Sequence, residues 1–189
     1  MKSRLSILIT SLLLSLFLFA VTAFLQWEDW FSKSDVETVE GQPDMVAHTL
    51  EQWSFNEDGA KQYQLLADTM QQFVNQNRNL MNKPSVLFFE GITPSWKTRA
   101  NQAVSDATNH TLHLSGQVVI EQKSVDEPAT LETDTLVLYP KTYHASTEDQ
   151  VIIRRTGVYI EAIGLDADFN ANKITLRTNV TSIYEPDKL

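Results

Sequence analysis

An alternation of apolar and polar residues over positions 111–121 constrains the fold more than any other part of the sequence. Four apolar side chains of this stretch fall on even positions, at Leu112, Leu114, Val118 and Ile120. A period of two places such a set on one face of a β-strand and the polar side chains on the other. Gly116 occupies an even position in mid-strand, and it predicts a bulge or a close approach to the backbone.

The same rhythm returns near the C-terminus. The spacing of Leu112, Leu114 and Val118 equals the spacing of Ile174, Leu176 and Val180. This repeat predicts a sheet built from a recurring strand-and-turn unit, with an apolar face that lines an interior. Such a sheet keeps an edge at each end, and exposed edges invite strand addition by another protein.

Turn signals between short alternating stretches extend this pattern over most of the chain. Residues 56–59, Asn-Glu-Asp-Gly, predict a hairpin turn, and residues 145–150 predict another turn. Residues 80–89 are expected as one apolar strand that a proline interrupts, and residues 158–169 as two strands that meet after Gly164. The pattern indicates an all-β sandwich, barrel or open roll.

The N-terminus follows a different pattern. After Lys2 and Arg4, residues 5–25 contain no charged side chain, which is roughly 31 Å of helix and enough to cross a bilayer core. Trp27 and Trp30 follow, as expected of an interfacial aromatic anchor. The basic end stays in the cytoplasm, so the rest of the chain is exported. The alternative is a cleaved signal peptide with its cleavage site near residues 21–23.

Four segments follow from these patterns. Residues 1–31 are expected to form a single transmembrane anchor with its interfacial aromatics, and residues 32–43 a polar, acidic linker. Residues 44–186 are expected to form the exported β-domain, and residues 187–189 a short tail.

Composition excludes several kinds of function. The chain has no cysteine, and its net charge of -9 argues against a nucleic-acid partner. His110 and His113 are three apart on the expected strand, so they face opposite ways and do not share a metal. There is no Gly-x-Ser-x-Gly elbow and no phosphate-binding glycine loop. We therefore expect no catalytic residue, no metal site, no cofactor and no enzymatic activity.

The apolar interior permits two interpretations, a closed core and a groove for acyl chains. The residues expected to line it share the inward face of their strands: Leu112, Leu114, Val118, Leu136, Leu138, Ile174, Leu176 and Val180. Trp53 and Phe55 are expected to contribute aromatic surface to the same interior.

The order of the short motifs resembles that of a known family. After the N-terminal helix come Pro43-Asp44-Met45, Asn56-Glu-Asp-Gly59, Leu112-x-Leu-x-Gly116, Leu131-Glu-Thr-Asp134 and Gly164-Leu-x-Ala-Asp168. Their sequence and spacing over nearly the whole chain are similar to those of the LptC family, the bitopic inner-membrane components of lipopolysaccharide export.

The resemblance implies a periplasmic β-jellyroll, an open roll shared with the soluble protein LptA, on a single-pass anchor in the bacterial inner membrane. It implies that lipopolysaccharide arrives from an ABC transporter of LptB, LptF and LptG. The acyl chains would occupy the interior and pass to LptA, which pairs with the C-terminal edge strand. The alternative is a structural adaptor, a closed β-domain that bridges envelope proteins without a lipid-binding lumen.

Particular residues inherit roles from the resemblance. Thr49 matches a ligand-lining threonine and Gly59 a functionally sensitive glycine, with Gly116 and Gly164 as further structural glycines. Met81 and Ser115 stand where the family can have aromatic residues, and Met81 is expected to contact lipid. The strand that lines the end of the groove and meets LptA is expected to use Ile174, Leu176, Val180 and Tyr184.

Overall fold

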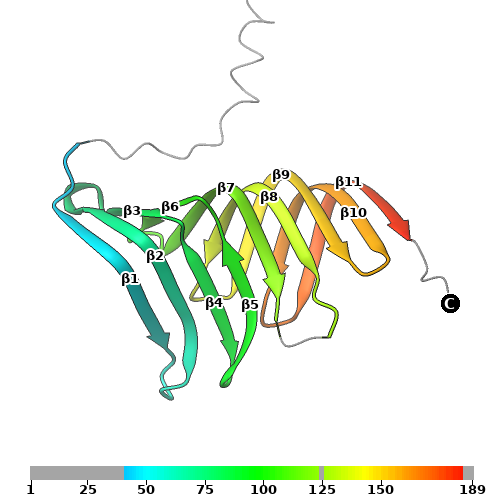
Figure 1. The fold of residues 1–189 in the computed structure, drawn as a ribbon, viewed down its shortest axis with the longest axis horizontal. Helices are drawn as coiled ribbons and strands as arrows, with labels where there is room; N and C mark the ends of the chain where they lie inside the picture. Colours follow the sequence, from blue (N-terminus) through cyan, green and yellow to red (C-terminus); the bar gives the residue numbers. More distant parts are fainter. Residues whose placement is uncertain (1–40, 124–125, 185–189) are drawn as a thin grey trace, which may run out of the picture. The chain divides into compact units, whose positions relative to one another are not determined.

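The computed structural model describes residues 41–123 and 126–184, which form one antiparallel sheet of eleven strands (Figure 1). The expected membrane anchor, the first part of the linker and the tail lie outside these residues. Within the described ranges, no helix has the length and apolar character that a membrane crossing requires. The all-β prediction is confirmed for the described part of the chain.

Most strands pair with their neighbours in the sequence. The strands are β1 (Met45–Phe55), β2 (Lys61–Phe73), β3 (Arg78–Asn82), β4 (Ser85–Glu90), β5 (Thr93–Arg99), β6 (Gln102–Asp106), β7 (Thr111–Gln122), β8 (Thr130–Tyr139), β9 (His144–Arg155), β10 (Val158–Asp168) and β11 (Lys173–Tyr184). A short 3₁₀ turn, Val74–Gln76, follows β2. The sheet order is β11-β10-β9-β8-β7-β5-β4-β2-β3-β6, with β1 beside β2 and a further pairing of β6 with β7.

Three predicted boundaries were wrong. Residues 145–150 form part of β9, because their polar side chains alternate with Ala145 and Thr147, which are buried. Residues 80–89 form two strands, since Pro84 cannot donate to a ladder and separates β3 from β4. Residues 158–168 form one strand, β10, which passes through Gly164 with a register shift.

Left-handed backbone residues recur at one level of the sheet, in β1, β7, β10 and β11 and in the link between β3 and β4, and we call this line the crease. Its positive φ angles are 58° at Thr49, 48° at Lys83, 52° at Gln117, 75° at Gly164 and 52° at Asn179. Neighbouring segments are joined there: Lys83 N donates to Asn101 O, and Asn101 N donates to Gly116 O, both at 2.8 Å. Bulges of this kind bend strands and increase their twist.

Gly116 and Gly164 fit the crease for two reasons. Their φ angles of 73° and 75° are left-handed, and a side chain there would meet a neighbour. A Cβ on Gly116 would lie 3.0 Å from Nδ2 of Asn101, and one on Gly164 would lie 2.9 Å from Cδ of Arg177. The bulge predicted at Gly116 is confirmed by the register shift between Ser115 and Val118.

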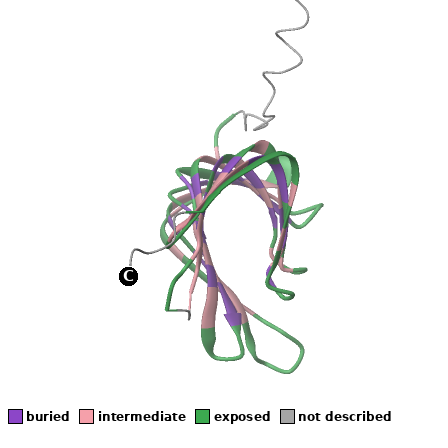
Figure 2. Ribbon diagram, turned by 90° about the vertical axis from the view of Figure 1, so that its right-hand side faces the viewer, coloured by how far each residue is buried: buried purple, intermediate pink, exposed green. Residues whose placement is uncertain are grey.

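The crease bends the sheet into an arch with an inner and an outer face (Figure 2). The inner face carries one continuous hydrophobic core to which most of the strands contribute. Val118, Leu138 and Leu165 on this face have no measurable exposure. The alternation predicted for residues 111–121 is confirmed, because the even-numbered Leu112, Leu114, Val118 and Ile120 are all buried there.

Candidate functional site

The described surface has two kinds of hollow. Two hollows of about 400 and 390 Å³ are lined largely by polar outward side chains such as Gln117, Glu132 and Arg99. A third, of about 220 Å³, lies on the inner face and is lined by Leu65, Met81 and their neighbours. Because the inner hollow continues the apolar face, we treat it as the candidate site.

Most of the residues predicted to line the interior do lie on the inner face. Leu112, Leu114, Val118, Leu136 and Leu138 are between 0 and 3 % exposed and belong to the core. Ile174 and Leu176 are partly buried and pack against it from the edge strand. The structure therefore brings these seven residues together as one apolar surface.

Trp53 lies on the outer face, so its predicted position inside the groove was wrong, and Phe55, beyond the register shift at the end of β1, is 54 % exposed. In the register of β1 and β2, Gln52 is paired with Leu65 and Trp53 with Gln64, and the buried Leu65 marks the inner face. The Trp53 ring stacks on Phe89 with centroids 5.7 Å apart, and Nζ of Lys61 lies 4.4 Å from the Trp53 ring centroid. Alternation along β1 was too loose in the sequence to assign this face.

The remaining predicted residues lie at three different places. Thr49 is exposed at the crease, and Gly59 lies in the turn between β1 and β2. Met81 is 3 % exposed on the inner face. Val180 and Tyr184, on the edge strand β11, are 53 % and 71 % exposed.

The inner cavity lies where the apolar face changes to a polar one. Met70, Met81 and Leu65 line its apolar side, and Asn79 and Ser105 line its polar side. Nδ2 of Asn79 donates to Oγ of Ser105 at 2.9 Å, whereas Oδ1 of Asn79 is buried without a partner. Sequence reasoning missed Asn79, because an asparagine among the polar residues 75–79 is typical of a turn.

Aromatic side chains from distant segments meet across the interior, and we call them the aromatic bridge. Phe88 of β4 lies 5.2 Å from Phe169 and 5.4 Å from Tyr143, measured between ring centroids. Trp96 of β5 lies 5.4 Å from Phe169, and its Nε1 donates to Oδ1 of Asn172 at 3.0 Å. Tyr143, Phe169 and Asn172 come from the turns after β8 and β10, so these turns bind the opposite wall of the arch.

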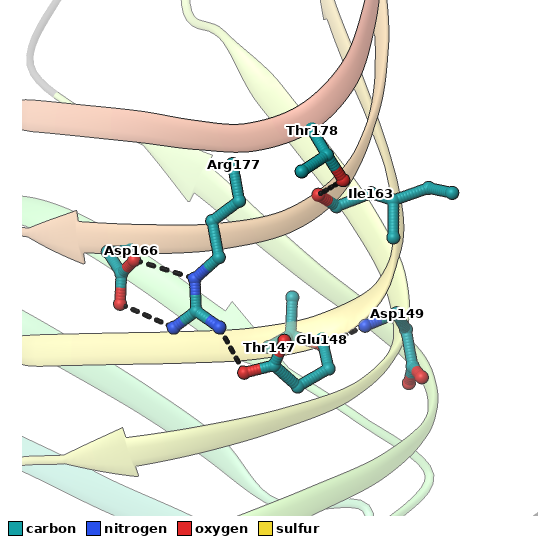
Figure 3. A network of polar contacts seen from close by, with 7 residues as sticks. All are labelled: Thr147, Glu148, Asp149, Ile163, Asp166, Arg177 and Thr178. Atoms are coloured by element: carbon teal, nitrogen blue, oxygen red, sulfur yellow. Dashed lines mark hydrogen bonds and ion pairs between the residues drawn. The ribbon is translucent and has the colours of Figure 1, made fainter. Parts of the chain in front are cut away.

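Arg177 fastens the edge strand β11 to its two neighbours (Figure 3). Its Nε and Nη2 donate to the carboxylate of Asp166 on β10 at 2.8 and 2.9 Å, and its Nη1 donates to Glu148 on β9. Oγ1 of Thr178 also donates to the carbonyl oxygen of Ile163 at 3.3 Å. Strand β11 thus has a polar attachment on the outer face, although none of its twelve described residues is buried.

Two pKa shifts reflect this geometry. The hydrogen bond from Arg177 holds the pKa of Asp166 below its usual value. Burial lowers the pKa of His113, which lies opposite Val104 and Val137. In residues 41–123 and 126–184, no group of three His, Cys, Asp or Glu could hold a metal ion.

The fold and the site define a class of protein, a curved antiparallel β-roll whose distinctive surface is an apolar interior. The crystal structure of LptH from Pseudomonas aeruginosa, described as the LptA homologous periplasmic component of the lipopolysaccharide transport device, has this fold. It superposes with a TM-score of 0.52 at 14 % identity, covering 66 % of this chain and 95 % of LptH.

The sequence comparisons identify the family. The model of the family described as "Lipopolysaccharide-assembly, LptC-related" matches residues 12–185. The lipopolysaccharide export system protein LptC of Haemophilus influenzae is 26 % identical over 186 residues, which cover 84 % of this chain and 88 % of that protein. The chain therefore belongs to the LptC-related family, whose members are transport components and not enzymes.

Proposed function

We propose that this protein carries lipopolysaccharide across the periplasm, with the acyl chains held against the inner face of the arch. One observation supports this most directly: an unbroken row of apolar side chains crosses five strands. In successive registers Met70 is paired with Met81, Met81 with Ala103, Ala103 with Leu114, and Leu114 with Leu136. The family membership and the LptH-like fold support the same role.

The physical driving force for binding is burial of hydrocarbon. Each buried methylene contributes ~0.8 kcal/mol, so a few acyl chains supply ample affinity without a charged contact. The protein has a net charge of -9, so it does not hold the anionic phosphates of a lipid strongly. Weak phosphate binding suits a carrier that must release its cargo. The energy for directional transport would come from the partner transporter.

Loading requires the arch to open. Its middle is filled by its own side chains, and the aromatic bridge joins Phe88 and Trp96 on one wall to Phe169 on the other. We propose that entering acyl chains separate these rings, so that apolar contacts between ring and acyl chain replace the apolar contacts between the rings. The cavity beside Met81 is a part of the interior that is already open.

Transfer of cargo would use the two sheet edges. Among the described strands, β11 pairs with β10 alone, and its last residues include the exposed Val180, Ile183 and Tyr184. We propose that LptA adds its N-terminal edge strand here, which would continue the inner face into the next molecule. The opposite edge, β1, would dock on the transporter components LptB, LptF and LptG, with residues 1–31 anchoring the chain in the inner membrane.

Neighbouring residues on opposite faces provide the decisive test. Four variants of the full chain each carry one photo-crosslinking residue. The positions form two pairs, Leu114 with His113 and Ile174 with Thr175. Each variant is incubated with lipopolysaccharide and irradiated. We expect lipid adducts from the inward members, Leu114 and Ile174, and few from the outward members. Equal labelling within both pairs, or no labelling at any of the four positions, would contradict the carrier and favour a structural adaptor.

The edge pairing has its own test. A proline at Val180 interrupts the ladder that an added strand would use, so we expect Val180→Pro to weaken capture of LptA. An unchanged circular dichroism melt would show that the core remains intact. Undiminished capture by this folded variant would contradict pairing at β11.

A further inference from the structure

The inner face ends in a polar row beside the apolar row that carries the proposed function. Gln72, Asn79 and Ser105 are paired in successive registers, and Ser105 is in turn paired with the buried Leu112. Each lies two residues from a member of the apolar row, so it shares the inner face with Met70, Met81 or Ala103. The cavity of about 220 Å³ borders both rows.

Asn79 has an unused hydrogen-bonding atom at this boundary. Its amide nitrogen donates to Ser105, but Oδ1 is buried and has no partner. Two other buried oxygens in the described ranges share this condition, on Thr98 and Thr133, but neither residue lines the cavity. A buried polar atom without a partner carries a desolvation penalty, which a ligand can remove by supplying the missing hydrogen bond.

The size of the cavity limits what it can take. At about 220 Å³ it is below the ~300–1,000 Å³ typical of pockets that enclose a whole small molecule. It therefore suits one segment of a larger ligand. The lining is apolar at Leu65 and Met70, becomes polar at Asn79, and carries the exposed Lys141 near the turn after β8.

We propose that Asn79 recognises a hydroxyl or amide group near the polar end of an acyl chain and so fixes how deeply the chain enters the arch. The chain beyond that group lies along Met81, Met70 and Leu65. The donor on the chain satisfies Oδ1 of Asn79, and the polar head lies toward Lys141. This inference rests on the proposed function and adds selectivity, because an unsubstituted alkyl chain leaves the Asn79 oxygen unsatisfied.

The experiment compares two photoreactive probes that differ in one group. Both are methyl esters of tetradecanoic acid with a diazirine at the chain end, and one carries a 3-hydroxyl. The neutral esters prevent the charges of Lys141 and Asp106, which also lines the cavity, from biasing the result. The full chain in lipid nanodiscs is labelled with each probe, and the yield on inner-face peptides is measured by mass spectrometry.

Substitutions then isolate the asparagine. Asn79→Leu removes the polar amide at nearly constant volume, and Asn79→Ala is a second variant in case leucine disturbs packing. Asn82→Leu is the matched control, since Asn82 is an exposed residue on the same strand, β3. Comparing the hydroxyl-to-alkyl yield ratio between variants cancels any difference in how the probes enter the bilayer.

We expect Asn79→Leu and Asn79→Ala to lower that ratio about two- to tenfold, the range for one net hydrogen bond, and Asn82→Leu to leave it unchanged. Lipopolysaccharide should displace the hydroxylated probe from the wild-type protein. If both probes label the inner face but the Asn79 variants leave the hydroxyl-to-alkyl yield ratio unchanged, the role of Asn79 is overturned. The proposed carrier function would then still stand. Failure of both probes to label the inner face of any variant would overturn the carrier itself.

Discussion

Strands β7 and β11 have the same spacing of apolar residues and contrasting surroundings. Leu112, Leu114 and Val118 of β7 are 3, 1 and 0 % exposed. The corresponding residues of β11 are two partly buried side chains and Val180, which is 53 % exposed. Both strands also turn left-handed at the equivalent position, with φ of 52° at Gln117 and at Asn179.

The difference comes from neighbours and not from the strands themselves. Strand β7 pairs with β8 on one side and with β5 and β6 on the other, whereas the one described partner of β11 is β10. An apolar pattern therefore fixes which face a strand turns inward, but the strands beside it decide how much surface is buried. The apolar residues of β11 remain available for burial against another molecule.

The largest expected effect tests this contrast in stability. Leu114→Ala should lower the free energy of unfolding by about 3 kcal/mol, because it removes a fully buried side chain and leaves a cavity. Leu176→Ala, at the equivalent position of β11, should cost less than about 1 kcal/mol. Urea unfolding followed by tryptophan fluorescence would measure both, and equal losses would show that β11 belongs to the core.

The crease gives a smaller contrast. Gly116→Ala should cost about 1–2 kcal/mol, because alanine is strained at a φ of 73° and its Cβ would press against Asn101. Asn179→Gly should change stability by less than about 0.5 kcal/mol, since asparagine already tolerates this conformation. Paired urea titrations measure the difference. A Gly116→Ala variant as stable as wild type would mean that the crease does not depend on the glycine.

The Arg177 attachment should affect only the edge. Arg177→Met keeps an unbranched apolar stem but removes the guanidinium and its bonds to Asp166 and Glu148. Amide hydrogen exchange should become faster in β11 and stay unchanged in β7. The pKa of Asp166 should rise toward its ordinary value, because the hydrogen bond that lowers it is lost. Unchanged exchange in β11 would mean that backbone pairing alone holds this strand.

The smallest expected effect is a pH dependence within β7. The pKa of His113 is lowered by burial, so the folded chain binds a proton there less readily than the unfolded chain. Stability should therefore decrease as the pH falls below the histidine's ordinary pKa of about 6.5. His113→Gln should reduce this decrease slightly between pH 7 and 5. An identical pH profile in both proteins would show that His113 does not contribute.

The sequence predicted the inner face of β7 and the bulge at Gly116, because these features are local patterns, and it predicted the family from the order of short motifs along the chain. It mispredicted residues 145–150, since Ser146, Glu148 and Asp149 resemble a turn, although they belong to β9, where Glu148 is exposed and the other two are partly buried. It also placed Trp53 on the wrong face. In β10 the inward residues change from even to odd numbers at the crease, from Ala162 to Leu165, so alternation read from one end of such a strand fails beyond that point.

The parts of the site that the sequence could not predict depend on contacts between distant segments. Phe169 and Tyr143 lie in turns, and nothing local indicates that they cross the interior to reach Phe88. Asn79 follows a run of polar residues, and its inward position emerges only from its pairing with Ser105. Such contacts require the order of the strands, which no single stretch of sequence specifies.

The crease distributes the curvature over the sheet in two ways. Thr49, Gln117, Gly164 and Asn179 turn left-handed within their own strands, whereas β8 and β9 cross the same level without a left-handed residue and with register shifts against their neighbours. A strand donated by another protein should therefore meet Asn179 with either a left-handed residue or a register shift, because a regular ladder at this level would flatten the wall at the junction.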